Sequence, residues 1–69
     1  MKYAVVIEKA DSSYSAYVPD LPGCISTGRS LDEVEQNIRD AIAFHIAGLR
    51  EGGEAVPEPT THVAELEIV

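Results

Sequence analysis

One cysteine and two histidines are the residues of this chain best suited to nucleophilic catalysis. Cys24 stands at the edge of a turn, and His45 and His62 are the bases that would have to activate it. A thiol becomes a strong nucleophile when a basic neighbour lowers its pKa. However, His45 falls on the apolar side of a predicted helix, and His62 follows a proline-rich stretch. The pattern therefore favours Cys24 as a small buried hydrophobe.

Carboxylates are the other groups that could support chemistry, through bound metal ions. Metal-dependent hydrolysis needs several carboxylates around two ions roughly 3.5–4 Å apart. The conceivable ligands are Glu8, Asp40, Glu65 and Glu67. Glu65 and Glu67 fit the solvent face of a strand, Asp40 fits the solvent face of a helix, and the strand-like run Tyr3–Ile7 carries no acid. The sequence predicts no metal site, no cofactor and no catalytic residue.

A turn-rich stretch, YVPDLPGCISTGRSLDEV (Tyr17–Val34), is the most distinctive part of the chain. Proline fixes φ near −65° and glycine accepts positive φ, so Pro22-Gly23 fits the centre of a type II turn. Such a rigid corner lowers the entropy of the unfolded chain and the ordering cost of binding a partner. We predict that the partner-contact residues of this corner are Tyr17, Asp20 and Leu21. The alternative is that the corner only shapes the fold.

Five segments with regular patterns surround this corner. Tyr3–Ile7, Tyr14–Val18 and Cys24–Thr27 are rich in strand-forming residues, with turn residues between them. A helical pattern runs from Leu31 to Gly52-Gly53, and residues 63–69 alternate between apolar and polar positions as a last strand. The element order is βββαβ in an α+β domain, with Ala64, Leu66 and Ile68 on the inner face of that last strand.

The helix has a clear beginning and one anomalous residue. Ser30 followed by Glu33 forms the capping box Ser-x-x-Glu, which marks a helix N-terminus. Apolar residues then recur every three or four positions and predict one packed face. Phe44 lies outside this stripe, on the polar side. We predict that Phe44 is a self-association contact, with partial cover by the following loop as the alternative.

The arrangement of these elements follows from connection rules. A strand, a helix and a further strand in one sheet form a right-handed crossover, which places the last strand parallel to a neighbour. Tyr3–Ile7 is apolar on both faces and suits the middle of a sheet. We therefore expect a mixed four-stranded sheet of order 3-2-1-4 with one long helix on one face. Residues 1–69 form a single domain whose thin core favours oligomerisation.

The charge balance restricts the partners of this domain. Twelve acidic and five basic residues give a net charge of −7. Phosphate backbones must be neutralised by Lys or Arg, so the chain is unsuited to bind nucleic acid directly. An acidic surface attracts cationic proteins, or it only maintains solubility. We find no signal-peptide pattern and no apolar run of membrane-spanning length, so we expect a cytoplasmic protein without membrane contact.

Three motifs together resemble the HicB family of type II antitoxins, over essentially the whole chain. They are YVPDLPGC (Tyr17–Cys24), TGRSLDEV (Thr27–Val34) opening the long helix, and Pro57-Glu58-Pro59 before the last strand. The resemblance implies a partial RNase H-like domain that neutralises a HicA-type toxin, a small basic mRNA-cleaving protein with a catalytic histidine. It also implies self-association, as a dimer or tetramer. Many such antitoxins carry a further DNA-binding domain, and this chain has no basic segment that would form one.

Two other functions remain open on the residues alone. An RNase H-like remnant could act as a metal-dependent hydrolase through the carboxylates named above. Alternatively, the chain could be an orphan, self-associating scaffold without a toxin. The antitoxin-like binding module is our leading interpretation.

Overall fold

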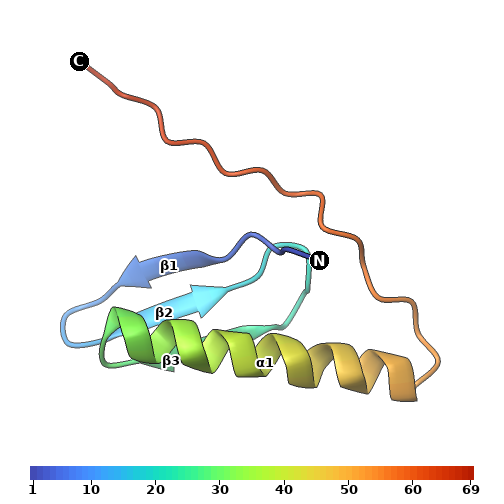
Figure 1. The fold of residues 1–69 in the computed structure, drawn as a ribbon. Helices are drawn as coiled ribbons and strands as arrows, with labels where there is room; N and C mark the ends of the chain where they lie inside the picture. The colour runs from blue at the N-terminus through green and yellow to red at the C-terminus, as the bar shows by residue number, and fades with distance from the viewer.

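The computed structural model describes residues 1–69 and contains three strands and one long helix (Figure 1). The strands are β1 (Val6–Lys9), β2 (Tyr14–Tyr17) and β3 (Ile25–Gly28), and the helix α1 spans Leu31–Glu51. Strands and helix are segregated along the chain, so the domain is of the α+β class, as predicted. The first strand begins three residues later than expected, because Tyr3–Val5 are extended without ladder pairing.

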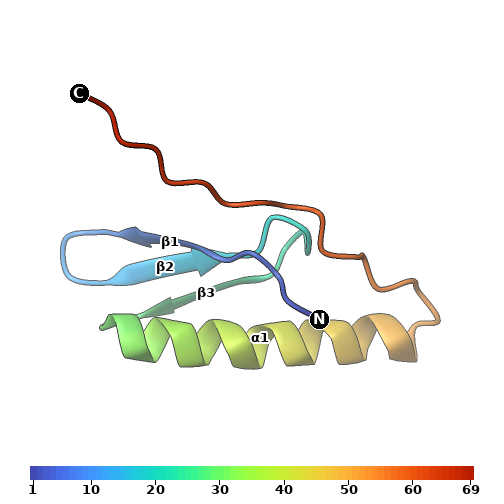
Figure 2. The ribbon, with the colours of Figure 1, turned by 45° about the horizontal axis from the view of Figure 1, so that its top comes forward.

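The sheet is antiparallel with the order β1-β2-β3, so β2 is central. Ile7 pairs with Ala16, and Ala16 pairs with Ser26, which fixes the register across the sheet. Side chains alternate between the two faces of a strand. One face, which includes Ile7 and Ala16, packs against α1, while the other has no covering element (Figure 2). The three strands have the predicted order, but β1 lies at the edge of the sheet and not in its middle.

The predicted fourth strand is not paired in this structure. Residues 62–69, here called the arm, are extended, are all exposed and form no ladder with β1. The sheet is therefore three-stranded and antiparallel, not four-stranded and mixed. Figures 1 and 2 show the arm leaving the domain on the β1 side and ending far from it. The alternation of residues 63–69 predicted a last strand, whereas the structure shows an extended segment without a pairing partner.

Local hydrogen bonds fix both ends of α1. The Ser30 hydroxyl accepts from the Glu33 N–H at 3.1 Å, which is the predicted cap. The Glu33 carboxylate in turn accepts from the Arg29 N–H at 2.8 Å, one residue earlier than in a standard capping box. At the other end, Gly53 has φ 71° and donates to the Arg50 carbonyl, while the Glu54 N–H donates to the Leu49 carbonyl. These are the two bonds of a Schellman motif.

The core is a small cluster between sheet and helix, consisting of Ala16, Val18, Leu21, Cys24, Val34 and Ile38. Gly28 allows α1 to approach this closely. A Cβ atom at Gly28 would lie 2.5 Å from the backbone nitrogen of Val34, which is closer than van der Waals contact. The Asn37 side-chain amide also donates to the Thr27 carbonyl at 2.8 Å and ties the helix to β3. The beginning of the helix is thus fixed against the last strand of the sheet.

Candidate protein-binding site

The uncovered face of the sheet carries a row of apolar side chains, which we call the outer row. The register places Val6 opposite Tyr17, and Tyr17 opposite Ile25, so the three side chains cross all three strands on one face. Tyr17 is 42% exposed and Ile25 is 69% exposed. An apolar row that no other element of the chain covers is typical of a protein-binding surface. The predicted contact residue Tyr17 lies at its centre.

The corner beside this row is closed by three backbone hydrogen bonds. Leu21 N–H donates to the Val18 carbonyl, Cys24 N–H donates to the Leu21 carbonyl, and Val18 N–H donates to the Cys24 carbonyl. Gly23 has φ 83°, as position i+2 of the predicted type II turn requires. These turns direct Leu21 into the core, where it is 0% exposed. The prediction that Leu21 contacts a partner is therefore wrong, because its side chain is part of the hydrophobic core.

Asp20 binds another part of the chain. Its carboxylate accepts four hydrogen bonds of 2.9–3.0 Å, from the backbone N–H and the hydroxyl of both Thr60 and Thr61. Donation by the Thr61 N–H, with the other three bonds, lowers the pKa of Asp20 from 3.8 to about 2, against a smaller opposing effect of desolvation. We call this contact the clamp. The Asp20 oxygens are thus bonded within the chain, and the contact of Asp20 with a partner stays a prediction.

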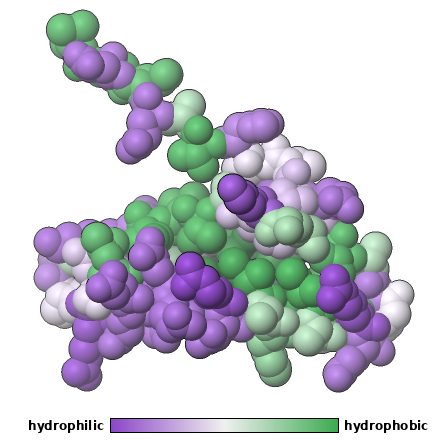
Figure 3. Space-filling model, in the orientation of Figure 1, coloured by the Kyte–Doolittle hydropathy of each residue, from purple (hydrophilic) through white to green (hydrophobic).

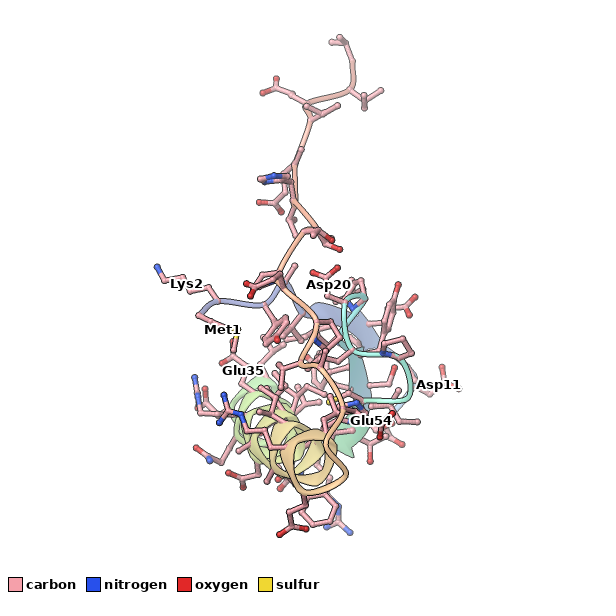
Figure 4. All side chains as sticks on the ribbon, turned by 90° about the vertical axis from the view of Figure 1, so that its right-hand side faces the viewer. Met1, Lys2, Asp11, Asp20, Glu35 and Glu54 are labelled. Atoms are coloured by element: carbon pink, nitrogen blue, oxygen red, sulfur yellow. The ribbon has the colours of Figure 1, made fainter.

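A second contact holds the segment that precedes the arm. The Tyr3 hydroxyl donates to the Pro57 carbonyl at 2.6 Å. Residues 54–61, here called the connector, are therefore attached both to the N-terminal segment and to the corner. Figure 4 shows the connector passing beside Asp20 before the arm rises away from the helix. The direction in which the arm leaves the domain is set by these two contacts.

The residues considered for catalysis are not assembled into a site. Cys24 is 3% exposed, and burial raises the pKa of its thiol, which keeps it protonated and poorly nucleophilic. His45 is half-buried in α1, and His62 lies exposed on the arm. Glu8 lies on β1, Asp40 accepts a hydrogen bond from Gln36 on α1, and the two acids of the arm are exposed. No group of three or more acidic, histidine or cysteine residues is positioned to hold a metal ion.

The outer side of α1 is acidic and bears one large aromatic residue. Its exposed acids include Asp32, Glu33, Glu35 and Asp40. Asp32 and Glu33 lie in the first turn, where they complement the helix dipole. Phe44 is 83% exposed, so the loop that follows the helix does not cover it. Its role in self-association remains a prediction. No helix of the structure has both the length and the apolar composition needed to cross a membrane.

A groove of about 480 Å³ lies along the free edge of β1, where the sheet meets α1. We call it the edge groove; its apolar lining consists of Tyr3, Val5, Ile7, Ile38 and Ile42. Lys2, Glu35 and Arg39 supply its charged groups. Figure 3 shows apolar surface between the polar outer side of the helix and β1, and more apolar atoms along the arm.

Sequence reasoning missed the two threonines of the clamp, the outer-row residues Val6 and Ile25, and the edge groove. The signal for the clamp was available, because adjacent threonines after Pro59 offer two N–H and two hydroxyl donors to one carboxylate. Their separation of 40 and 41 residues from Asp20 hides the pairing. The outer row required the register between strands, which the sequence does not specify.

The sequence of this chain matches a known family. Residues 3–68 match the model of the HicB-like antitoxins of bacterial toxin–antitoxin systems. The chain belongs to this family. The resemblance stated from the three motifs is thereby confirmed.

Several relatives of this HicB-like chain come from bacteria, archaea and a phage. A UPF0150 protein of Synechocystis is 38% identical over 97% of this chain and 86% of its own length. A UPF0150 protein of Thermoplasma acidophilum is 41% identical over 83% of this chain and 84% of its own. A 14.9 kDa protein of Haemophilus phage HP1 is 45% identical over 84% of this chain. The match covers only 44% of that phage protein, so the chain spans less than half of its length.

A solved structure shares the HicB-like fold. A chain of the HicA3 and HicB3 toxin–antitoxin complex matches with a TM-score of 0.75 and 30% identity. The match covers 87% of this chain and 70% of that chain. The family match and this structural match support a role in a toxin–antitoxin system.

Proposed function

We propose that this HicB-like chain is an antitoxin that binds a HicA-type toxin directly and blocks its mRNA-cleaving activity, without catalysis or a cofactor of its own. The observation that carries the proposal is the likeness, over 87% of the chain, to a chain of a toxin–antitoxin complex. We propose further that residues 1–69 act as one partial RNase H-like domain, in the cytoplasm where an mRNA-cleaving toxin acts.

We place the toxin-binding site on the outer row. Val6, Tyr17 and Ile25 form apolar surface on rigid strands, and aromatic anchors such as Tyr17 commonly dominate the free energy of protein association. Because these side chains point away from the core, their contact with a toxin leaves the packing against α1 unchanged. The net charge of −7 favours encounter with a basic toxin.

The test is calorimetric titration of the full chain with a HicA-type toxin encoded beside it, inactivated at its catalytic histidine. We expect a complex whose affinity falls as salt is raised, because part of the attraction is electrostatic. Tyr17→Ala should weaken binding by at least ~10-fold, which corresponds to the loss of a modest hot spot. Phe44→Ala is the matched control, since it also removes an exposed aromatic ring, but from α1.

The outcomes separate the function from the site. Absence of binding to the toxin would refute the antitoxin function. Binding that is lost with Phe44→Ala but not with Tyr17→Ala would keep the function and reject the outer row as the site. We propose no hydrolase function, because no observation brings the candidate carboxylates together.

A further inference from the structure

The arm and the edge groove are complementary surfaces that are present in the same chain but do not meet in it. The exposed fractions of Leu66 and Ile68 on the arm are 79% and 85%. The edge groove is apolar and borders the free edge of β1, whose backbone groups have a ladder partner on one side only. An unpaired edge strand is a template for another strand.

The dimensions and the pattern of the arm fit this edge. Residues 63–69 span about 23 Å as an extended strand, the same length as residues 3–9, which comprise β1 and the segment before it. Ala64, Leu66 and Ile68 share one face of such a strand, and Glu65 and Glu67 share the other. With the apolar face turned toward α1, Leu66 and Ile68 would cover the apolar lining of the edge groove.

The charges also fit. The arm carries Glu65 and Glu67 but no Lys or Arg. Of the five Lys and Arg residues of the chain, Lys2 and Arg39 line the edge groove, together with one acid, Glu35. Two copies of a chain with net charge −7 repel each other over most of their surfaces. Lys2 and Arg39 outnumber Glu35 at this groove, so the repulsion between two copies is smaller there than over the rest of the acidic surface.

The clamp argues that the arm fills the groove of a different copy. Thr60 and Thr61 are held by Asp20, and Pro57 is held by Tyr3, so the root of the arm is fixed at the domain. From this fixed root the arm projects away from its own β1, although that edge is free (Figures 1 and 4). Exchange of an identical segment between two copies uses surfaces that each copy already has, and it closes as a symmetric dimer.

We infer that two copies of this chain exchange their arms, and that residues 63–69 of each copy add as a strand beside β1 of the other and fill its edge groove. Each copy then has the four strands that its sequence pattern predicts, in the order 3-2-1-4, with the fourth supplied by its neighbour. The inference concerns the chain alone and does not rest on binding to a toxin.

The first test is sedimentation equilibrium of the full chain with two double variants. L66E/I68E places charge on the face that enters the groove, whereas V63E/V69E makes the same change on the opposite face. Neither pair touches the core of the domain. We expect a dimer whose dissociation constant rises at least ~100-fold with L66E/I68E, because two large apolar side chains per arm lose their burial. V63E/V69E should change it by less than ~10-fold.

The second test identifies which copy supplies the arm. In an equimolar mixture of isotope-labelled and unlabelled chains, filtered nuclear Overhauser spectra report only contacts between copies. Contacts of the Leu66 and Ile68 methyl groups with those of Ile7 and Ile42 are expected in this filtered spectrum. A monomer at millimolar concentration, arm contacts within one copy only, or a dimer that responds equally to both double variants would each overturn the inference. So would a dimer that dissociates with Phe44→Asp but not with L66E/I68E.

Discussion

Leu21 offers the sharpest test of how the corner works. It lies between two prolines in a turn, a place where apolar residues are commonly exposed, yet its side chain is 0% exposed. Two turns, closed by hydrogen bonds from Leu21 to the Val18 carbonyl and from Cys24 to the Leu21 carbonyl, direct it inward. Leu21→Ala would leave a cavity that this fixed backbone cannot fill by collapsing.

The expected size of the effect follows from burial and from the small size of the domain. A buried Leu→Ala change costs about 2–5 kcal/mol in free energy of unfolding. A chain of 69 residues has a total stability of only about 3–10 kcal/mol. Leu21→Ala should therefore remove roughly half of the stability. The matched control is Ile25→Ala, because Ile25 is 69% exposed and its truncation should cost about 1 kcal/mol or less.

Urea unfolding at fixed protomer concentration measures both variants, and toxin titration gives a second readout. Leu21→Ala should lower the unfolding midpoint and leave the affinity of the folded fraction unchanged. Ile25→Ala should leave the unfolding midpoint nearly unchanged and weaken the affinity for the toxin, because Ile25 belongs to the outer row. If Leu21→Ala does not fold, Leu21→Val, which removes one methylene, should lower stability by about 1 kcal/mol. A fully stable Leu21→Ala protein with weakened binding would refute our assignment of Leu21 to the core.

Two further predictions concern the contacts that hold the helix and the arm. Gly28→Ala should destabilise the fold by about 1–3 kcal/mol in urea unfolding, because its Cβ would meet the Val34 backbone; an unchanged midpoint would contradict this close approach. The Asp20 carboxylate should titrate near pH 2 in NMR spectra, and the Thr61 amide resonance should follow it. Because the pKa of Asp20 is lowered from 3.8, the stabilising effect of the clamp is complete above about pH 4 and is lost as pH falls through 2. Titration of Asp20 near 3.8 would contradict the clamp. So would an Asp20→Asn variant whose stability depends on pH in the same way as that of the unchanged chain.

The locally determined parts of the fold were predictable from the sequence. Pro22-Gly23 forms the expected turn because φ restrictions act within a few residues. The helix begins after Ser30 and ends at Gly52-Gly53 because capping by a hydroxyl and the positive φ of a glycine are also local effects. The reach of Glu33 to Arg29, one residue before the cap, depends on a side-chain rotamer and was not predictable.

The contacts between distant segments were not predictable from one sequence. The alternation of residues 63–69 indicates a strand but does not say which edge, or which copy, it pairs with. Asp20 has the signature of a surface turn residue, and only the folded chain brings Thr60 and Thr61 to it. The outer row likewise exists only because the register aligns Val6, Tyr17 and Ile25. The contact predicted for Tyr17 from its place at the rigid corner stays a prediction, and the register puts this residue at the centre of the outer row.

The two faces of the sheet contribute unequally to the core. Ala16 on β2 belongs to the hydrophobic core and Ile7 on β1 packs against it, whereas Val6, Tyr17 and Ile25 contribute little to it. Substitutions at these three positions can therefore accumulate without unfolding the domain. If the outer row binds a toxin as proposed, a lineage can change which toxin it binds, one exposed residue at a time, while the inward-facing residues keep the same scaffold.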